Sequence, residues 1–375
     1  SVDLNGSTQH HWGWESVLNK EGDILFQGSI NNGVKIWHRT DAYGASWSHV
    51  HTPASDNSFV SNCKSIAISD TGYSFISGNS DYDSSRGRIY FYSYDGNSNP
   101  VQLTFIDGEN QSDQFGLGMS MSGDGTVAAV TAHAYPSGGL DGRVYVYKYS
   151  DGSWSLSQTL DKNQTGEAFG SSVALSNDGK TLFVGASEND SGGTNAGCVY
   201  VYKLDIDGFF NYYITQPGTY RADLQICGID YKTNEVEVTG SISLFESFSA
   251  TSSQTLVTSD GVSFPSGYGD TRHIATTNST LVVGSTSGNG AIYVFEKTNG
   301  VWTQVQKMTA ASPVSGSYFP VSVAIHGDII VCCTYGPTIN DGFVYVFEKT
   351  NGVWPSTETV KIDPQYQRLK DIDIY

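Results

Sequence analysis

Basic residues are few in this chain. Twenty Lys and Arg stand against 38 Asp and Glu in 375 residues, which gives a formal net charge of −18. Binding to a nucleic-acid backbone relies on an excess of Lys and Arg that neutralises phosphates. Docking on anionic lipid needs clusters of the same residues. The charge balance therefore excludes a broad nucleic-acid-binding surface and argues against electrostatic attachment to a membrane.

The residues that build ordinary helices are also scarce. Only 15% of the residues are charged, below the usual quarter or so, and Met occurs three times. The chain is instead rich in glycine, with 42 residues, and in tyrosine, with 23. Tyr, Val, Ile and Thr favour strands, whereas Gly, Asn, Asp and Ser favour turns. This composition predicts an all-β protein, built either as two or three domains or as one large repeat array.

Long hydrophobic runs are missing as well. The longest aliphatic runs, such as Ile329 to Cys333, have about five residues, whereas a helix that spans a bilayer needs roughly 20. We therefore expect no membrane insertion. The five Cys are an odd number without metal-type spacing, and the adjacent Cys332 and Cys333 would point to opposite faces of a strand. Small core residues are the favoured interpretation of all five, and a disulfide between some pair stays open.

One five-residue phrase recurs along the chain: a small or polar residue, an apolar residue, any residue, an apolar residue and an aromatic one. Arg143–Tyr147 and Cys198–Tyr202 are clear copies. The first apolar residue of each copy stands at positions 34, 89, 144, 199, 242, 292 and 344, so the spacings are 55, 55, 55, 43, 50 and 52. Seven copies at this period cover nearly the whole chain and indicate a repeat architecture.

Each copy lies in a larger frame that the fourth copy shows best. Phe169 to Ser176 alternates and predicts a strand, Asn177-Asp178-Gly179 predicts a hairpin turn, and Thr181 to Ala186 and Cys198 to Lys203 predict two further strands. A fourth, variable strand is expected near Phe210 to Thr215. Four strands joined by hairpins at this period are typical of a propeller blade. One sheet cannot bury both of its faces by itself, but stacking on the next blade buries them.

The sequence thus predicts an all-β fold, a single seven-bladed β-propeller of four-stranded antiparallel blades over residues 1–375. The blades are expected at about 10–52, 59–106, 114–160, 168–216, 219–259, 267–309 and 316–362. The fifth copy, roughly Ala222 to Thr258, is the most divergent. Residues 363–375 are expected to add a strand that either closes the ring or leads to a further domain.

The fourth copy also carries a family resemblance. Phe169-Gly170-Ser171-Ser172-Val173-Ala174-Leu175, then Val184-Gly185-Ala186, then Gly197 to Tyr202 resembles the FG-GAP repeat. This repeat is the blade motif of integrin α-subunit propellers and of many surface proteins of bacteria, algae and large viruses. The resemblance implies a seven-bladed propeller that is usually extracellular and often adhesive. It identifies a fold more than an activity.

One feature of the integrin-type repeat is missing. Its calcium loop between the first two strands contains several Asp, because calcium needs about six to eight oxygen ligands. The corresponding turns here, such as Ser122-Gly123-Asp124-Gly125 and Ser176-Asn177-Asp178-Gly179, hold one carboxylate each. We therefore interpret them as hairpin turns and expect no cofactor and no metal. Calcium is an alternative that these turns do not support.

No catalytic motif stands out. A sialidase would need three Arg around the substrate carboxylate. The chain has seven Arg in all, and Arg88 and Arg143 occupy the same position of successive repeats, which the repeat itself explains. Paired carboxylates for glycoside hydrolysis remain open, because 38 acids always place some pairs close together. We expect no enzymatic activity, with a propeller glycosidase or lyase as the alternative.

The loops between the second and third strands are long and varied, and variable loops on a rigid frame are where binding usually occurs. Loops of three successive blades should be neighbours on one face. We predict that they bind a ligand through Asp81, Tyr82, Asp83, Arg86, His133, Tyr135, Asp141, Glu188 and Asp190. Tyrosine offers rigid contact area, and carboxylates accept sugar hydroxyls. Solvated loops without a ligand are the alternative.

Five Asn-x-Ser/Thr sequons add to an extracellular interpretation. They lie at Asn5, Asn110, Asn163, Asn189 and Asn278. We therefore expect a secreted or surface-exposed propeller of a cell or virion that binds a glycan or a surface protein. Two alternatives stay open: an assembly unit of an extracellular fibre or virion surface, whose partner is another copy, and the glycosidase named above.

Overall fold

The structure is a computed structural model. It describes residues 12–29, 33–40, 46–51, 63–161, 166–190, 197–204, 252–260, 273–286, 289–313, 318–335 and 342–363, together with short strands between 213 and 243. The chain divides into two compact units. One unit combines Ser1–Leu204 with Ala250–Tyr375, and the other is Asp205–Ser249.

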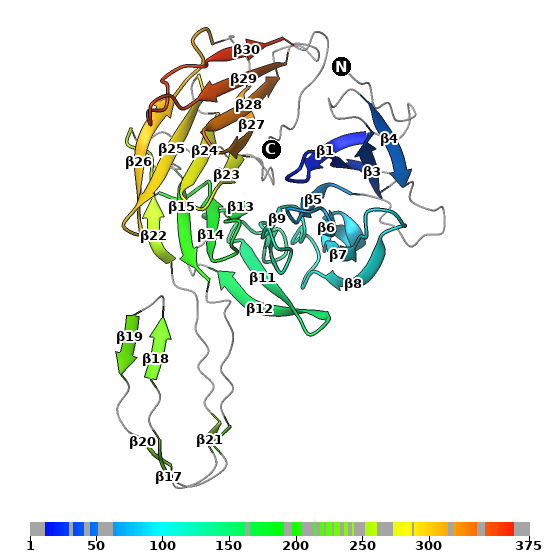
Figure 1. Ribbon diagram of the computed structural model, residues 1–375, viewed down its shortest axis with the longest axis vertical. Coiled ribbons are helices and arrows are strands. Elements are labelled where there is room, and N and C mark those ends of the chain that lie inside the picture. Colours follow the sequence, from blue (N-terminus) through cyan, green and yellow to red (C-terminus); the bar gives the residue numbers. More distant parts are fainter. Residues whose placement is uncertain are drawn as a thin grey trace. The chain divides into compact units, whose positions relative to one another are not determined.

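The first unit consists of four-stranded antiparallel sheets whose strands are hydrogen-bonded in chain order (Figure 1). Blade 1 contains β1 (Trp12–Leu18), β2 (Ile24–Ser29), β3 (Gly33–Arg39) and β4 (Trp47–His51). Blade 2 contains β5 (Ser65–Ile68), β6 (Ser74–Asn79), β7 (Arg88–Ser93) and β8 (Val101–Asp107). Blade 3 contains β9 (Met119–Met121), β10 (Val127–Ala132), β11 (Arg143–Ser150) and β12 (Ser153–Asp161).

The remaining three blades follow the same order, with one exception in blade 4. Blade 4 contains β13 (Phe169–Leu175), β14 (Thr181–Ala186), β15 (Cys198–Lys203) and β22 (Ser252–Leu256). Blade 5 contains β23 (Ile274–Thr276), β24 (Thr280–Ser285), β25 (Ala291–Thr298) and β26 (Val301–Met308). Blade 6 contains β27 (Tyr318–His326), β28 (Ile329–Tyr335), β29 (Phe343–Glu348) and β30 (Val360–Ile362). The described residues therefore form six blades.

The prediction of seven blades was wrong, and so was the predicted blade at 219–259. The fourth strand of blade 4 is β22, not the segment near Phe210 to Thr215, and β22 pairs with β15. Residues 205–249 are inserted between these two paired strands. In blades 4 and 5, the first apolar residues of the recurring phrase are Val199 and Ile292, which are 93 residues apart. When the 45 inserted residues are subtracted, 48 residues remain, which is close to the length of one repeat. An insertion of nearly one repeat length therefore imitated a divergent blade.

The second unit contains three short antiparallel ladders nested within one another. β16 (Tyr213–Ile214) pairs with β21 (Ile242–Ser243), and β17 (Gly218–Tyr220) pairs with β20 (Val236–Val238). β18 (Asp223–Ile226) pairs with β19 (Ile229–Lys232). Ile242 and Ser243 of the apparent fifth copy thus form β21 in a two-stranded ladder rather than the third strand of a blade.

The turns between the first and second strands explain why blades 3 and 4 begin as tight hairpins. In blade 3, the Ser122 hydroxyl accepts from the Val127 amide at 3.0 Å and donates to the Asp124 carboxylate at 2.6 Å. Gly125 follows with a φ of +73°, which suits glycine. Ser176 and Asp178 repeat this arrangement in blade 4. In these two turns the carboxylate thus has a local structural partner.

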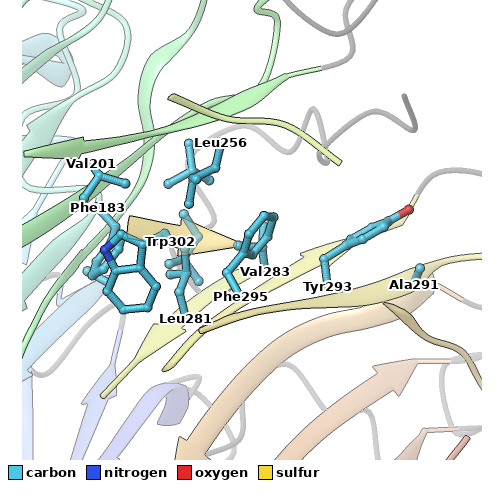
Figure 2. Close-up of a cluster of buried hydrophobic side chains, with 12 residues drawn as sticks. Phe183, Val201, Leu256, Leu281, Val283, Ala291, Tyr293, Phe295 and Trp302 are labelled. Atoms are coloured by element: carbon cyan, nitrogen blue, oxygen red, sulfur yellow. The ribbon is translucent and has the colours of Figure 1, made fainter. Parts of the chain in front are cut away.

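In each third strand, successive side chains point alternately toward the two neighbouring blades and so form two rows. We call the first and third positions of the strand's apolar-x-apolar-aromatic core the forward row, and the second and fourth positions the backward row. Forward residues of one blade share a hydrophobic cluster with backward residues of the next for blades 1–2, 2–3, 4–5 and 5–6. Figure 2 shows the 4–5 cluster, in which Val201 and Phe183 of blade 4 lie near Trp302 and Phe295 of blade 5.

The first strands of the six blades line one common cavity of about 780 Å³. Its lining includes Glu15 to Val17 of β1 and Ser322 to His326 of β27. Cys63, Cys198, Cys332 and Cys333 are buried and form no disulfide in the described part of the chain, in agreement with their interpretation as core residues. Cys227 lies outside the described residues. No helix in the described part of the chain is long and apolar enough to cross a membrane.

A glycine before the third strand locks each of three blades to the next one. Gly142 has a φ of +73°, and a Cβ atom there would clash with the backbone carbonyl of Phe169, which opens blade 4. Gly87 meets Phe115, and Gly290 meets Phe319, in the same way. All three phenylalanines are buried. The phenylalanine at the start of each of these three blades and the glycine of the preceding blade therefore form a single contact.

We expect Gly142→Ala to lower the free energy of unfolding by about 3 kcal/mol or more, because it combines a left-handed backbone conformation with a backbone clash. Gly152→Ala is the matched control, since Gly152 has a φ of +80° and a Cβ atom added there would meet nothing within 4 Å. Gly152→Ala should lower the free energy of unfolding by about 1 kcal/mol, because only the left-handed backbone conformation opposes the added side chain. Urea unfolding followed by fluorescence measures both, and equal losses would contradict the locking role of Gly142.

Candidate functional site

The predicted ligand-binding residues lie in the loops that join the second and third strands of blades 2, 3 and 4. These loops run between β6 and β7, between β10 and β11, and between β14 and β15. The last one is described only to Asp190 and again from Gly197. Two connecting segments lead from one blade to the next: residues 108–118 run from β8 to β9, and residues 166–168 precede β13. Hydrogen bonds to these segments join the loops to one another.

Backbone hydrogen bonds tie the loop of blade 2 to the first connecting segment. The carbonyls of Ser84, Ser85 and Arg86 accept from the amides of residues 112, 114 and 115, at 3.1, 2.8 and 3.2 Å. This loop contains the single turn α1 (Tyr82–Ser85). Asp83, Ser84 and Ser85 are left-handed, with φ of 48°, 59° and 61°, which is a costly conformation for non-glycine residues. The bonds to the connecting segment hold this conformation in place.

Asp113 joins the same connecting segment to the loop of blade 3. Its side chain is fully buried, and one carboxylate oxygen accepts from the Ser137 amide at 2.6 Å. The other oxygen accepts from the amide and the side chain of Asn110, at 3.0 and 3.1 Å. The Ala134 amide also donates to the Asp113 carbonyl at 3.3 Å. One buried carboxylate therefore fixes the connecting segment to the loop of blade 3.

The contacts continue to blade 4. The Ala168 amide donates to the Leu140 carbonyl at 2.6 Å, and the Gly166 amide donates to the Asp141 carboxylate at 3.0 Å. The Glu188 amide then donates to the Glu167 carbonyl at 3.0 Å. The three loops thus form one continuous hydrogen-bonded surface. The structure brings the predicted residues of these loops into this region, with His133 buried beneath it at 3% exposure, and their role in binding stays a prediction.

Each of the two predicted tyrosines is held by an arginine. The guanidinium carbon of Arg88 lies 3.9 Å from the centroid of the Tyr82 ring, and that of Arg143 lies 3.8 Å from the centroid of the Tyr135 ring. Both rings are half-buried, and Tyr135 also packs against the core between blades 2 and 3. Cation–π contact of this kind fixes the orientation of the rings.

The carboxylates of Asp81, Asp83 and Asp141 are engaged in ion pairs or in a bond from a backbone amide. Asp81 pairs with Lys64 at 2.7 Å and Asp83 with Arg86 at 3.2 Å, while the Asp81 and Asp83 side chains remain 46% and 41% exposed. Asp190 is exposed, and Glu188 is half-buried. In the described part of the chain, no three His, Cys, Asp or Glu side chains form a group that could hold a metal ion.

Glu167 and Asn189 form a buried polar cluster under the loop of blade 4. The Tyr200 hydroxyl and the Asn189 amide donate to one oxygen of the Glu167 carboxylate, at 2.7 and 2.8 Å. Burial, together with the Glu167 carboxylate, raises the pKa of Tyr200 well above its ordinary value. Asn189 is 2% exposed, so a glycan on its amide would require this cluster to open.

The other predicted glycosylation residues lie in different surroundings. Asn110 is half-buried and bonded to Asp113, whereas Asn278 is exposed in a turn and accepts from the Asp178 amide at 3.4 Å. Asn5 and Asn163 lie outside the described residues.

The sequence did not identify the residues that hold the loops of this surface in position. Asp113, Glu167, Arg88 and Arg143 position the loops, and Arg143 also pairs with Glu109 at 2.9 Å and Asp161 at 3.0 Å. A usable signal was present for the two acids. Each stands two residues before a Phe-Gly or Phe-opened strand, at Phe115 and Phe169.

We expect Asp113→Ala to lower the free energy of unfolding by about 3 kcal/mol, because buried donors would lose their acceptor. The Ser137 amide should also exchange with deuterium faster. Asp95→Ala is the control, since Asp95 likewise accepts two backbone amides but in an exposed turn, and it should change little. Slow exchange at Ser137 in Asp113→Ala would contradict the tethering role.

His133 should make the stability depend on pH. It is 3% exposed, and burial lowers its pKa. The unfolded chain takes up a proton at this residue near pH 6.5, which the folded chain resists, so the free energy of unfolding should fall as pH drops from 7 to 5. His133→Gln should remove this part of the decline, as measured by urea unfolding at each pH. Parallel plots of the free energy of unfolding against pH for the two proteins would contradict this role of His133.

Comparison with known proteins supports the fold. Residues 160–202 and 302–347 match the family described as FG-GAP repeat. No curated protein matches the chain. Among solved structures, the β-propeller domain of Cps50 (Swd1) from Myceliophteria thermophila is 11% identical with a TM-score of 0.53, covering 99% of this chain and 91% of that one.

Two further solved structures agree at the level of the fold. The structure of U3-55K is 14% identical with a TM-score of 0.55, covering 99% of this chain and 86% of that one. The RRP9 WD40 repeats give the same identity, TM-score and coverage of this chain, and 85% of their own. Such identities show the fold and no function. With two matched repeats in a structure of four-stranded blades, the chain is a β-propeller that contains FG-GAP repeats.

Proposed function

We propose that this chain is an extracellular, non-enzymatic binding propeller that recognises a glycan or a surface protein through the loops of blades 2 to 4. The observation that carries the proposal is the continuous hydrogen-bonded surface made by these loops. Its side chains are already ordered by Asp113, by the two Arg–Tyr contacts and by the ion pairs of Asp81 and Asp83. A preordered surface loses little conformational entropy when it binds.

The chemistry of the surface suits a ligand rich in hydroxyl groups. Exposed carboxylates accept hydroxyl donors, and tyrosine rings offer flat apolar area with a polar tip. No metal or cofactor is part of this proposal. An extracellular location follows from the family resemblance and the sequons, and it is part of the same proposal.

The test is a glycan array of neutral, sialylated and sulfated oligosaccharides, beside a panel of chromogenic glycosides. Tyr82→Ala combined with Asp83→Ala should weaken binding at least about tenfold, or roughly 1.4 kcal/mol. Glu21→Ala combined with Asp328→Ala is the control, because these exposed acids lie in turns between first and second strands. Equal loss in both variants would contradict the choice of surface.

The glycoside panel tests the non-enzymatic part. Turnover of any glycoside that disappears when a single carboxylate is changed would overturn it in favour of a glycosidase. The absence of turnover, with binding that depends on Tyr82 and Asp83, is the expected result.

A further inference from the structure

The cavity lined by the first strands has no part in the proposed function. Its volume is about 780 Å³, within the range of roughly 300 to 1,000 Å³ that is usual for small-molecule sites. All six blades contribute to its wall, and every residue that lines it lies in the described ranges. The cavity is therefore a candidate binding site in its own right.

A single carboxylate belongs to the part of this wall that the first strands form. It is that of Glu15 on β1. One of its oxygens, Oε2, accepts from the Ile66 amide of β5 at 2.6 Å, so the side chain reaches from blade 1 to blade 2. Because β5 is the end strand of its sheet, amides on its open edge are available to such acceptors. This bond holds the carboxylate at the wall of the cavity.

The other charged residues of the lining leave the cavity acidic. The lining holds three carboxylates, two lysines and one histidine. Both lysines already have a carboxylate: Lys20 pairs with Asp70 at 3.2 Å, and Lys349 pairs with Glu296 at 2.7 Å. The whole chain carries a formal net charge of −18. A cavity of one dominant sign concentrates ions of the opposite sign, so this one attracts cations and repels anions.

Apolar side chains continue along the wall from the carboxylate. Ile66, whose amide binds Glu15, is followed by Ala67, which shares a hydrophobic cluster with Met119 and Met121 of blade 3. All of these residues line the cavity. The two methionines are two of the three in the chain, and the flexible thioether of methionine adapts to apolar groups of irregular shape. A carboxylate and an adaptable apolar surface thus lie on neighbouring blades of one wall.

We propose that this cavity binds a small organic ammonium ion that carries an apolar chain. The ammonium group donates to the Glu15 carboxylate, which has acceptor capacity beyond its bond from the Ile66 amide, and the chain packs against Met119 and Met121. Hydrogen bonds between ionised groups are stronger than those between neutral groups, particularly away from bulk water.

A divalent metal ion suits the cavity less well than an ammonium ion. Calcium needs about six to eight oxygen ligands, several of them carboxylates. Within the described ranges, no three metal-binding side chains form a group that could supply them. The inference is independent of the proposed function, because the cavity is lined by the first strands and the turns that follow them rather than by the loops of blades 2 to 4.

Calorimetric titration of the full chain with hexylammonium chloride at neutral pH tests the proposal, with sodium hexanoate as the anion of comparable length. We expect hexylammonium to bind with a Kd of about 1 mM or lower, and hexanoate to bind at least about tenfold more weakly. Equal affinities, or no heat of binding for hexylammonium up to about 10 mM, would overturn the proposal. Tyr82→Ala combined with Asp83→Ala should leave hexylammonium binding unchanged, which separates this cavity from the proposed ligand surface.

Glu15→Gln tests the carboxylate. Glutamine keeps an oxygen that can accept from the Ile66 amide but carries no charge, so the fold should persist while the Kd rises at least about tenfold. Glu21→Gln is the matched control, because Glu21 is exposed in the turn after β1 and lies outside the lining. Equal losses of affinity in the two variants would show that net charge, and not this site, attracts the cation.

The methionines locate the ligand in the original chain, without a substitution at Glu15. With isotope-labelled methionine methyl groups, the NMR signals of Met119 and Met121 should shift during titration with hexylammonium. Met308 is the internal control, because it is fully buried between blades 5 and 6 and lies outside the lining. Met119→Leu, Met121→Leu and Met308→Leu assign the three signals. A shift of the Met308 signal alone, or of none of the three, would overturn the proposal even if Glu15→Gln did not fold.

Discussion

Every blade of this protein depends on contact with its neighbour. A four-stranded sheet of about 50 residues has two apolar faces, and water contacts at least one of them until another sheet covers it. The chain solves this with a directional contact: apolar forward residues of one third strand pack on aromatic backward residues of the next, as Phe91 packs on Tyr147. The glycine–phenylalanine contact, as at Gly142 and Phe169, sets how closely the two sheets approach.

The same dependence explains why the loops are ordered. Strands β6, β10 and β14 are buried almost throughout, so the loops that follow them start from fixed points. Buried carboxylates at Asp113 and Glu167 then replace water as acceptors for the loop amides and side chains. At the opposite ends of the strands, backbone bonds join successive turns, from Lys20 to Asp70, from Asp70 to Gly123 and from Gly123 to Asn177. Both ends of the blades are thus tied from one repeat to the next.

Much of this architecture was determined by the sequence alone. The period of the phrase, the Asp-Gly turns and the Phe-Gly openings predicted four-stranded blades, because these features depend on local backbone geometry and on neighbours one repeat away. The number of blades was not determined in this way. An insertion of 45 residues between β15 and β22 has the length of a repeat, and only strand pairing distinguishes it from one. Likewise, nothing local reveals that Asp113 is buried against the loop of blade 3, or that Val344 is half-buried where Val144 is buried, because burial depends on what the rest of the chain places against a residue.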